Sequence, residues 1–230
     1  MIQVKKSIGL HTIQDKGRVG YQSFGVPVSG PMDEVAFIIA NYLVLNEDSS
    51  SVIELSSGSL SLLFSSESVV AATGFAIVRV NGIGVPLWRP IYVSSGDVLD
   101  IQLNLSGNFA YLSIAGGWKS ELWLGSTATY LPLGVGKLIK QGAILTQLKG
   151  IDKRVDIFAK YLKSKGKKYD NWGVSTNSTP PYSSESIQLM RGMEINSFTK
   201  ESLVLFTERK YKIAHEKNRM AYVIEDAMLE

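Results

Sequence analysis

The sequence of 230 residues contains no cysteine and only two histidines, His11 and His215. The absence of cysteine excludes disulfide bonds, thiolate nucleophiles and zinc sites built on cysteine, and two histidines are too few for a histidine-rich metal site. No apolar run approaches the roughly 18 residues of a transmembrane helix. Residues 1–7 lack the apolar segment of a signal peptide, so we predict a cytoplasmic protein that does not bind membranes.

Charge of one sign is also scarce. The 24 Lys and Arg residues exceed the 21 Asp and Glu residues by only three, which leaves a net charge of +3. The lysine-rich stretch at 160–168 is interpreted as a solvated helix end, because so small an overall charge is not typical of a nucleic-acid-binding protein. Nucleic acid is therefore not an expected partner. The hydrophobic content of 45% is close to globular averages and predicts a folded chain.

Short alternating apolar runs separated by turn residues predict a mainly β protein. The dipeptide Asn81-Gly82 readily adopts the positive φ angles of a tight hairpin turn. We expect the sheet to occupy most of residues 48–150. The strands that these patterns predict cover residues 59–64, 77–80, 83–87, 99–104 and 110–115.

A few helices are also expected. The first follows Ser29-Gly30-Pro31, where a capping residue and a proline suit the start of a helix. A second is predicted near residues 152–162, and a third begins at Thr199 and runs through Phe206. The apolar residues expected to form the buried face of the first helix are Val35, Ile38, Ile39, Tyr42 and Leu43.

The composition changes after the second helix. Residues 160–181 are first lysine-rich and then rich in Asn, Ser, Thr and Pro, which is typical of an exposed connection. We therefore predict three parts. Residues 1–150 form a β subdomain with the early helix, residues 151–185 form a helix and an exposed linker, and residues 186–230 form part of a second subdomain.

The most unusual stretch runs from Thr12 to Asp33. Glycine recurs four times from residue 17 to residue 30, which favours a shaped loop that leads into a helix N-terminus. Such a terminus suits a carboxylate, a phosphate or an oxyanion. Asp15 and Asp33 are candidate acid or base groups, and Arg18 offers a planar fork for a carboxylate. The structural alternative is that Asp15 forms a turn, that Asp33 is a partner of the helix dipole, and that Ser29 is the helix cap.

Short motifs follow one another in a fixed order between residues 12 and 126. They are Thr12-Ile13-Gln14-Asp15, Gly17-Arg18, Gly20-Tyr21, Gly25-Val26-Pro27, Ser29-Gly30-Pro31-Met32-Asp33, Ala40-Asn41, Glu54-Leu55, Pro86-Leu87-Trp88-Arg89-Pro90, Ser95-Gly96-Asp97, Tyr111-Leu112, Ala115-Gly116-Gly117 and Leu124-Gly125-Ser126. In this order they resemble the KipA family, also called allophanate hydrolase subunit 2 or the C subunit of 5-oxoprolinase.

The resemblance implies a fold as well as a family. Its members have a cyclophilin-like β-barrel with a few helices, followed by a second barrel-like subdomain, and they are related to the carboxyltransferase part of urea carboxylase. Family members continue past the position of Glu230. We therefore expect the second barrel-like subdomain of this chain to be incomplete.

The resemblance also implies an activity. The chain resembles the C subunit of an ATP-dependent 5-oxoprolinase, which opens the lactam of 5-oxoproline to give glutamate. The implied partners are a B subunit of the KipI type and an A subunit of the LamB/YcsF type. ATP is used by the complex, and neither a cofactor nor a metal is expected in this chain. Two alternatives stay open: a carboxyltransferase module of a urea carboxylase or allophanate hydrolase-type system that uses carboxybiotin, and a KipA-type regulator that antagonises a KipI kinase inhibitor.

The resemblance places the candidate substrate-facing surface in the stretch from residue 14 to residue 33. Asp15 and Asp33 are the candidate catalytic residues. The predicted substrate-binding residues are Gln14, Asp15, Arg18, Tyr21, Ser29, Gly30, Pro31, Met32 and Asp33.

Overall fold

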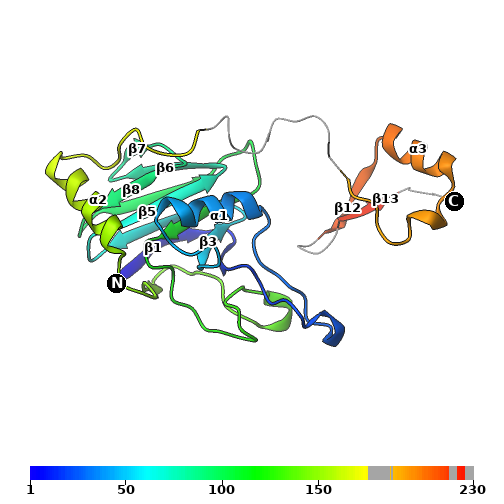
Figure 1. Ribbon diagram of the computed structural model, residues 1–230, viewed down its shortest axis with the longest axis horizontal. Coiled ribbons are helices and arrows are strands. Elements are labelled where there is room, and N and C mark those ends of the chain that lie inside the picture. Colours follow the sequence, from blue (N-terminus) through cyan, green and yellow to red (C-terminus); the bar gives the residue numbers. More distant parts are fainter. Residues whose placement is uncertain (176–186, 188, 218–221, 226–230) are drawn as a thin grey trace. The chain divides into compact units, whose positions relative to one another are not determined.

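The computed structural model describes residues 1–175, 187, 189–217 and 222–225 (Figure 1). The chain divides into two compact units, residues 1–180 and 181–230. Each unit is considered by itself below. Within the described ranges, every helix is too short or too polar to cross a membrane.

Two antiparallel sheets form the first unit (Figure 1). The six-stranded sheet has the order β11-β1-β4-β9-β6-β7, and the five-stranded sheet has the order β2-β3-β10-β5-β8. The strands are β1 (Ile2–Ile8), β2 (His11–Gln14), β3 (Val52–Leu55), β4 (Ser59–Phe64), β5 (Ser68–Gly74), β6 (Ala76–Val80), β7 (Ile83–Val85), β8 (Pro90–Val93), β9 (Val98–Leu103), β10 (Ala110–Ile114) and β11 (Ile144–Leu145).

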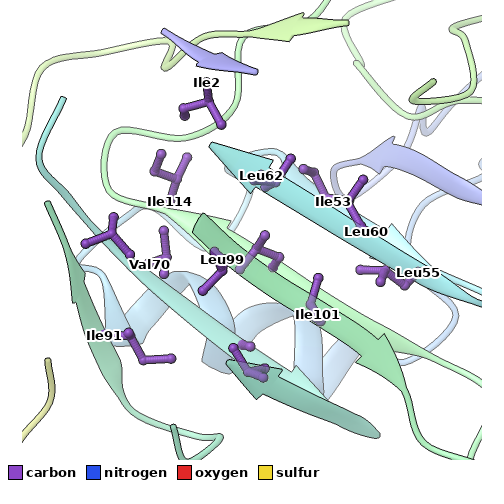
Figure 2. Packing of buried hydrophobic residues seen from close by; sticks show 14 of the residues in the cluster. Ile2, Ile53, Leu55, Leu60, Leu62, Val70, Ile91, Leu99, Ile101 and Ile114 are labelled. Carbon is purple, nitrogen blue, oxygen red and sulfur yellow. The ribbon is translucent and has the colours of Figure 1, made fainter. Parts of the chain in front are cut away.

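Apolar side chains from both sheets share one core (Figure 2). Leu62 and Ile101 of the six-stranded sheet belong to the same buried cluster as Ile53 of the five-stranded sheet. Because successive side chains of a strand point to opposite faces, the alternating runs place one apolar face of each sheet toward this core. The prediction of a mainly β fold is confirmed. The sheets also extend outside the expected range of 48–150, because β1 and β2 belong to them.

Two helices cover the other face of the five-stranded sheet. Helix α1 (Glu34–Leu43) packs against β5 and β10, and helix α2 (Lys153–Ser164) packs against β5 and β8. Every residue of β5 is consequently buried, although an antiparallel strand commonly has one solvated face. Strand β6 in the six-stranded sheet instead alternates buried and exposed residues.

The predicted buried face of α1 is wrong in part. Val35 and Tyr42 are exposed, whereas Ala36, Phe37 and Ala40 are fully buried. The small alanines allow the helix backbone to approach the sheet closely, and the Thr73 hydroxyl on β5 donates to the Ala36 carbonyl at 2.7 Å. The periodicity of the larger apolar residues could not reveal this, because alanine gives little hydrophobic signal.

Other local predictions are confirmed. Strands β6 and β7 form a hairpin at Asn81-Gly82, where the φ angles are 52° and 80°. Helix α2 has Asp152 as its N-cap and buries Val155, Ala159 and Leu162. It packs within the first unit, which extends to residue 180, while the subdomain boundaries expected at 150 and 185 stay a prediction.

The described part of the second unit is small. A 3₁₀ turn at Ile195–Ser197 precedes α3 (Lys200–Glu208), which Thr199 caps as predicted. Strands β12 (Lys212–Lys217) and β13 (Tyr222–Glu225) pair as an antiparallel hairpin. Ile187, Leu189 and Met190 lie outside the strands of this unit.

Candidate functional site

The segment from Asp15 to Asp33, called the motif loop below, connects β2 to α1. Its first part closes back on its last part, because the Arg18 amide donates to the Val28 carbonyl at 2.8 Å. Gly17 has a φ of 85°, and a side chain there would collide with the Val28 carbonyl oxygen. Glycine is therefore required at this crossing of the loop. A 3₁₀ turn at Gln22–Phe24 shapes the middle of the loop.

Asp15 joins the motif loop to residues 126 and 127. Its Oδ1 accepts from the Gly17 amide at 2.8 Å and from the Ser126 hydroxyl at 2.5 Å. Its Oδ2 accepts from the Thr127 amide at 2.6 Å and from the Thr127 hydroxyl at 3.0 Å. Each carboxylate oxygen thus accepts two bonds, which fills the usual capacity of the group. This carboxylate holds two loops together.

Arg18 packs against residues 123–128 and is only 1% exposed. Its Nη2 donates to the Ala128 carbonyl, its Nε lies 3.4 Å from the Trp123 carbonyl, and its guanidinium stacks 5.1 Å from the centre of the Trp123 ring. Burial lowers the pKa of Arg18, and the nearby Asp15 charge opposes this shift. Among the residues that the structure describes, Nη1 of Arg18 has no hydrogen-bond partner.

Gln14 and Ser29 converge on one backbone carbonyl. The Gln14 amide donates to the Thr129 carbonyl at 3.2 Å, and the Ser29 hydroxyl donates to the same oxygen at 3.0 Å. Gln14 is fully buried, and its Oε1 lacks a hydrogen-bond partner within the described ranges. Ser29 has a φ of 61°, a backbone conformation that side-chain-bearing residues seldom adopt. Both residues fix the motif loop to the segment at 128–129.

A buried polar pair supports the end of the motif loop. Glu54 on β3 accepts from the Met32 amide at 2.9 Å and from the Tyr111 hydroxyl at 3.0 Å. The Tyr111 hydroxyl also accepts from the Asp33 amide at 2.7 Å. Burial and the neighbouring Glu54 carboxylate raise the pKa of the Tyr111 phenol well above its ordinary value. Glu54 and Tyr111 matched family motifs but were not predicted as site residues, because their partners come from other parts of the sequence.

Asp33 caps helix α1, and its carboxylate accepts from the Ala36 amide at 2.9 Å. The backbone N–H groups of Met32 and Asp33 donate to Glu54 and Tyr111. These two N–H groups at the N-terminus of α1 are therefore bonded to side chains of the protein itself. The sequence predicts Ser29 as the cap and Asp33 as an acid or base, or as a partner of the helix dipole. The predicted cap is wrong, because Asp33 is the N-cap and the Ser29 hydroxyl donates to the Thr129 carbonyl instead.

An open cleft of about 470 Å³ lies beside the motif loop. Its walls come from residues 15–17, from the segment 45–51 after α1, from Gly116, from the turn at 122–127 and from residues 148–152. Lys16 and Lys149 bring cationic groups to the cleft, and each makes an ion pair at its edge, with Asp48 at 2.6 Å and with Glu47 at 3.3 Å. The volume and the mixed polar lining are suitable for a small organic ligand.

The predicted site residues do not all meet in this cleft. Asp15 lines it, whereas the buried Arg18 does not and instead contacts Trp123 in the turn at 122–127. Tyr21 is half-buried, and its carbonyl accepts from Phe24 and Val26 within the 3₁₀ turn. Five other predicted residues support the motif loop through hydrogen bonds or close backbone packing: Gln14, Ser29, Gly30, Met32 and Asp33. Pro31 precedes Met32 at the end of the loop and does not line the cleft.

The lysine-rich stretch after β11 makes ion pairs within the protein. Lys160 pairs with Asp156 at 2.7 Å and Lys163 with Glu67 at 2.8 Å. Lys168 pairs with Asp97, whose pKa is lowered by this and other hydrogen bonds against the opposing effect of burial. Much of the local positive charge is thereby balanced. In the described part of the chain, no three His, Asp or Glu side chains are grouped closely enough to hold a metal ion.

Comparison with known proteins defines the family. Residues 24–229 match the model of the carboxyltransferase domain, subdomain A and B. The chain therefore belongs to the carboxyltransferase domain family.

Individual relatives carry two different names. The chain is 40% identical over 144 residues to urea amidolyase from Saccharomyces cerevisiae, a match that covers 60% of this chain but only 8% of the relative. It is 26% identical over 235 residues to the 5-oxoprolinase C subunit from Escherichia coli, covering 100% of this chain and 70% of the relative. Among solved structures, urea amidolyase from Kluyveromyces lactis superposes with a TM-score of 0.77 at 25% identity, covering 97% of this chain and 14% of that protein.

Proposed function

We propose that this chain acts as the C subunit of an ATP-dependent 5-oxoprolinase, in which the lactam of 5-oxoproline is hydrolysed to glutamate. The observation that carries the proposal is the extent of the match to the C subunit of 5-oxoprolinase, which covers the whole chain and 70% of the relative. The urea amidolyase match covers only 8% of a much longer protein. Alignment of the whole chain with one subunit supports the role of that subunit.

The cleft supports a small acidic substrate. Its volume of about 470 Å³ accommodates a small ring, and Lys16 and Lys149 offer positive charge where a substrate carboxylate would enter. Asp15 lines the same cleft, but its oxygens already accept four hydrogen bonds. We therefore assign Asp15 the task of holding the cleft wall, and we place the ATP-dependent step with the partner subunits.

The proposed partners are a B subunit of the KipI type and an A subunit of the LamB/YcsF type. The test is to combine the three purified chains and measure the release of glutamate from 5-oxoproline. We expect release only when this chain, both partners and ATP are present. Mixtures that omit one component in turn are the controls. Glutamate release that continues at the same rate without this chain would overturn the proposal.

Within that assembly, Lys149→Ala tests the cleft. Loss of the cation is expected to raise KM for 5-oxoproline several-fold with little change in kcat, because a charge that holds the substrate carboxylate stabilises the ground state and the transition state equally. Lys160→Ala removes a lysine outside the cleft and serves as the matched control. An equal effect of the two substitutions would place the substrate elsewhere.

A carboxyltransferase role is the second candidate. The family match and the 40% identity to urea amidolyase over 144 residues favour it. In this case the chain would accept a carboxyl group from carboxybiotin and pass it to urea. The test is the transfer of radiolabelled carboxyl from a carboxylated biotin carrier to urea. If the three-component mixture releases no glutamate while label transfer depends on this chain, the second candidate replaces the first.

If the chain binds the KipI-type partner tightly but supports neither reaction, the result points instead to a regulator of a KipI-type protein. The complex is detected by size-exclusion chromatography with light scattering. This measurement separates loss of assembly from loss of chemistry, so it accompanies both activity assays.

A further inference from the structure

The Arg18 guanidinium is a buried cation with unused hydrogen-bonding capacity. It is 1% exposed, and Nη1 has no hydrogen-bond partner among the described residues. Burying a charge is costly unless the group is paired and hydrogen-bonded. The two contacts that its other nitrogens make are to neutral backbone carbonyls. Arg18 therefore retains donors that an anionic group could use.

Asp15 does not neutralise this cation through a direct bond. All four acceptor positions of its carboxylate are taken by Gly17, Ser126 and Thr127. In the described ranges no carboxylate lies within ion-pair distance of Arg18. The guanidinium is thus held in place by carbonyls and by an aromatic ring, with its Nη1 face left for a further acceptor.

A tight turn lies next to both Arg18 and the cleft. Trp123 and Ser126 pair across it, and the residues between them, Leu124 and Gly125, have φ angles of 49° and 77°. A leucine in the left-handed region stores strain of roughly 1 kcal/mol or more. The indole of Trp123 covers the guanidinium, while neighbouring Leu122, Gly125 and Thr127 line the cleft. One face of this Trp123 turn (residues 123–126) therefore contacts Arg18, and residues in and beside the turn line the cleft.

We propose that Arg18 recognises the carboxylate of a small organic acid, and that the Trp123 turn is a cover which moves to admit this group from the cleft. The two N–H groups of Nη1 donate to the acid, and the charge of the ligand replaces the missing counter-ion. The identity of the acid as 5-oxoproline rests on the proposed function. The recognition of a carboxylate rests on the geometry of Arg18 alone.

Binding to the full chain, in the absence of its partners, tests this. The probes are 5-oxoproline and 2-pyrrolidinone, which keeps the lactam but lacks the carboxylate, and the measurement is isothermal titration calorimetry. Wild type is expected to bind 5-oxoproline at least about tenfold more tightly than 2-pyrrolidinone, because charge-assisted hydrogen bonds contribute about this much or more. Arg18→Met is expected to abolish the difference, and Arg18→Lys to reduce it, since a lysine lacks the planar fork.

A second measurement does not require a variant of Arg18 to fold. Phenylglyoxal modifies accessible arginines, and mass spectrometry locates the product. We expect Arg18 to react slowly in wild type and in Trp123→Phe, which keeps an aromatic face, but at least about tenfold faster in Trp123→Ala, because loss of the indole removes the stacking contact that holds the turn in place. Added 5-oxoproline should protect Arg18 in Trp123→Ala, and 2-pyrrolidinone should not. The exposed Arg79 on β6 is the internal control, with a rate that stays constant.

Three outcomes would overturn the inference: no binding of 5-oxoproline to wild type, equal binding of the two probes, or labelling of Arg18 that neither Trp123→Ala nor 5-oxoproline alters. None of these outcomes determines the result of the glutamate-release assay, which measures the assembled complex. Conversely, carboxylate-dependent binding without glutamate release would support the role of Arg18 and contradict the proposed function.

Discussion

The two faces of the five-stranded sheet differ in polarity, although apolar side chains pack on both. The face toward the other sheet is apolar, with Ile53, Leu112 and Ile91 in the shared core. The face toward α1 carries a row of polar side chains that the strand register aligns across four strands. This row, called the polar row below, consists of Thr12, Glu54, Tyr111 and Thr73.

The difference shows where the fold is stabilised and where the motif loop is positioned. Stabilisation by the apolar face depends only on the shape and volume of its side chains, because the burial of carbon atoms is not directional. The polar row is directional: Glu54 and Tyr111 bind the backbone of Met32 and Asp33, and Thr73 binds α1. A buried polar group costs free energy unless its partner is correctly placed. The polar row therefore specifies where the motif loop lies.

The largest expected effect comes from the apolar face. Leu112 and Tyr111 are neighbours on β10 with side chains on opposite faces, and both are fully buried. Leu112→Ala is expected to lower the free energy of unfolding by about 2–5 kcal/mol, because it leaves a cavity in the core. Tyr111→Phe is expected to cost about 1–3 kcal/mol, because the Glu54 acceptor and the Asp33 donor lose a partner. Urea unfolding followed by circular dichroism measures both.

Tyr111→Phe and Leu112→Ala should also differ in which backbone amides exchange faster with solvent. Tyr111→Phe is expected to increase hydrogen exchange at the amides of Met32 and Asp33, whereas Leu112→Ala raises exchange throughout both sheets. If Tyr111→Phe proves the more destabilising change, or leaves exchange at the motif loop unaltered, the division between a stabilising face and a positioning face is wrong.

The next effect concerns Asp15. Asp15→Asn retains one acceptor oxygen where the carboxylate has two, so part of the bonding to Ser126 and Thr127 is lost. We expect a loss of about 1–3 kcal/mol in the free energy of unfolding and faster hydrogen exchange at the Thr127 amide. Asp33→Asn is the matched control, because asparagine is about as good an N-cap as aspartate and the change should be close to neutral. Equal losses from the two variants would contradict the role of Asp15 in joining the loops.

A smaller effect is expected from pH. The pKa of the buried Tyr111 phenol is raised above its ordinary value near 10, because burial and the Glu54 charge disfavour the phenolate. Above pH 10 the unfolded chain releases this proton while the folded chain keeps it, so the stability that Tyr111 contributes is present below pH 10 and is lost as the pH rises. The loss is up to about 1.4 kcal/mol per pH unit.

Comparison with Tyr111→Phe isolates this contribution from the other tyrosines and the lysines. The difference in unfolding free energy between wild type and the variant should shrink from pH 9 to pH 11 at constant ionic strength. A difference that stays constant would mean that the phenol ionises equally well in the folded state, which its burial argues against.

The sequence predicted local features much better than the site. The Asn81-Gly82 hairpin and the capped helix α2 depend on neighbouring residues, and both are found where they were expected. The buried face of α1 was partly missed, because it depends on alanines that fit closely against Thr73. Local sequence patterns determine turns and caps. Close packing between segments that are distant in the sequence cannot be predicted from such patterns.

The candidate site shows the same limit. The glycine-rich stretch correctly indicates a shaped loop that leads into a helix, but the predicted cap, Ser29, is wrong because Asp33 is the N-cap. The bonds from Asp15 to Ser126 and Thr127 and from Glu54 to Met32 join residues that are 22 or more positions apart. No spacing rule within a helix or a strand relates such positions. Family motifs pointed to Glu54 and Tyr111, but only the strand register shows that they support the loop.

The smallest effect should come from the solvent-exposed surface of α2. Lys160 and Asp156 form an i,i+4 ion pair on α2 at 2.7 Å, with the lysine side chain 70% exposed. Solvent screens such a pair, and ordering two long side chains offsets most of its attraction. Lys160→Ala is therefore expected to leave the unfolding midpoint in urea unchanged within error, at both low and high salt. Val155→Ala, on the buried face of the same helix, is the contrasting variant and should lower the midpoint clearly. If the lysine substitution instead destabilised the protein as much as the valine substitution, surface charge would have to rank beside the apolar core as a determinant of this fold.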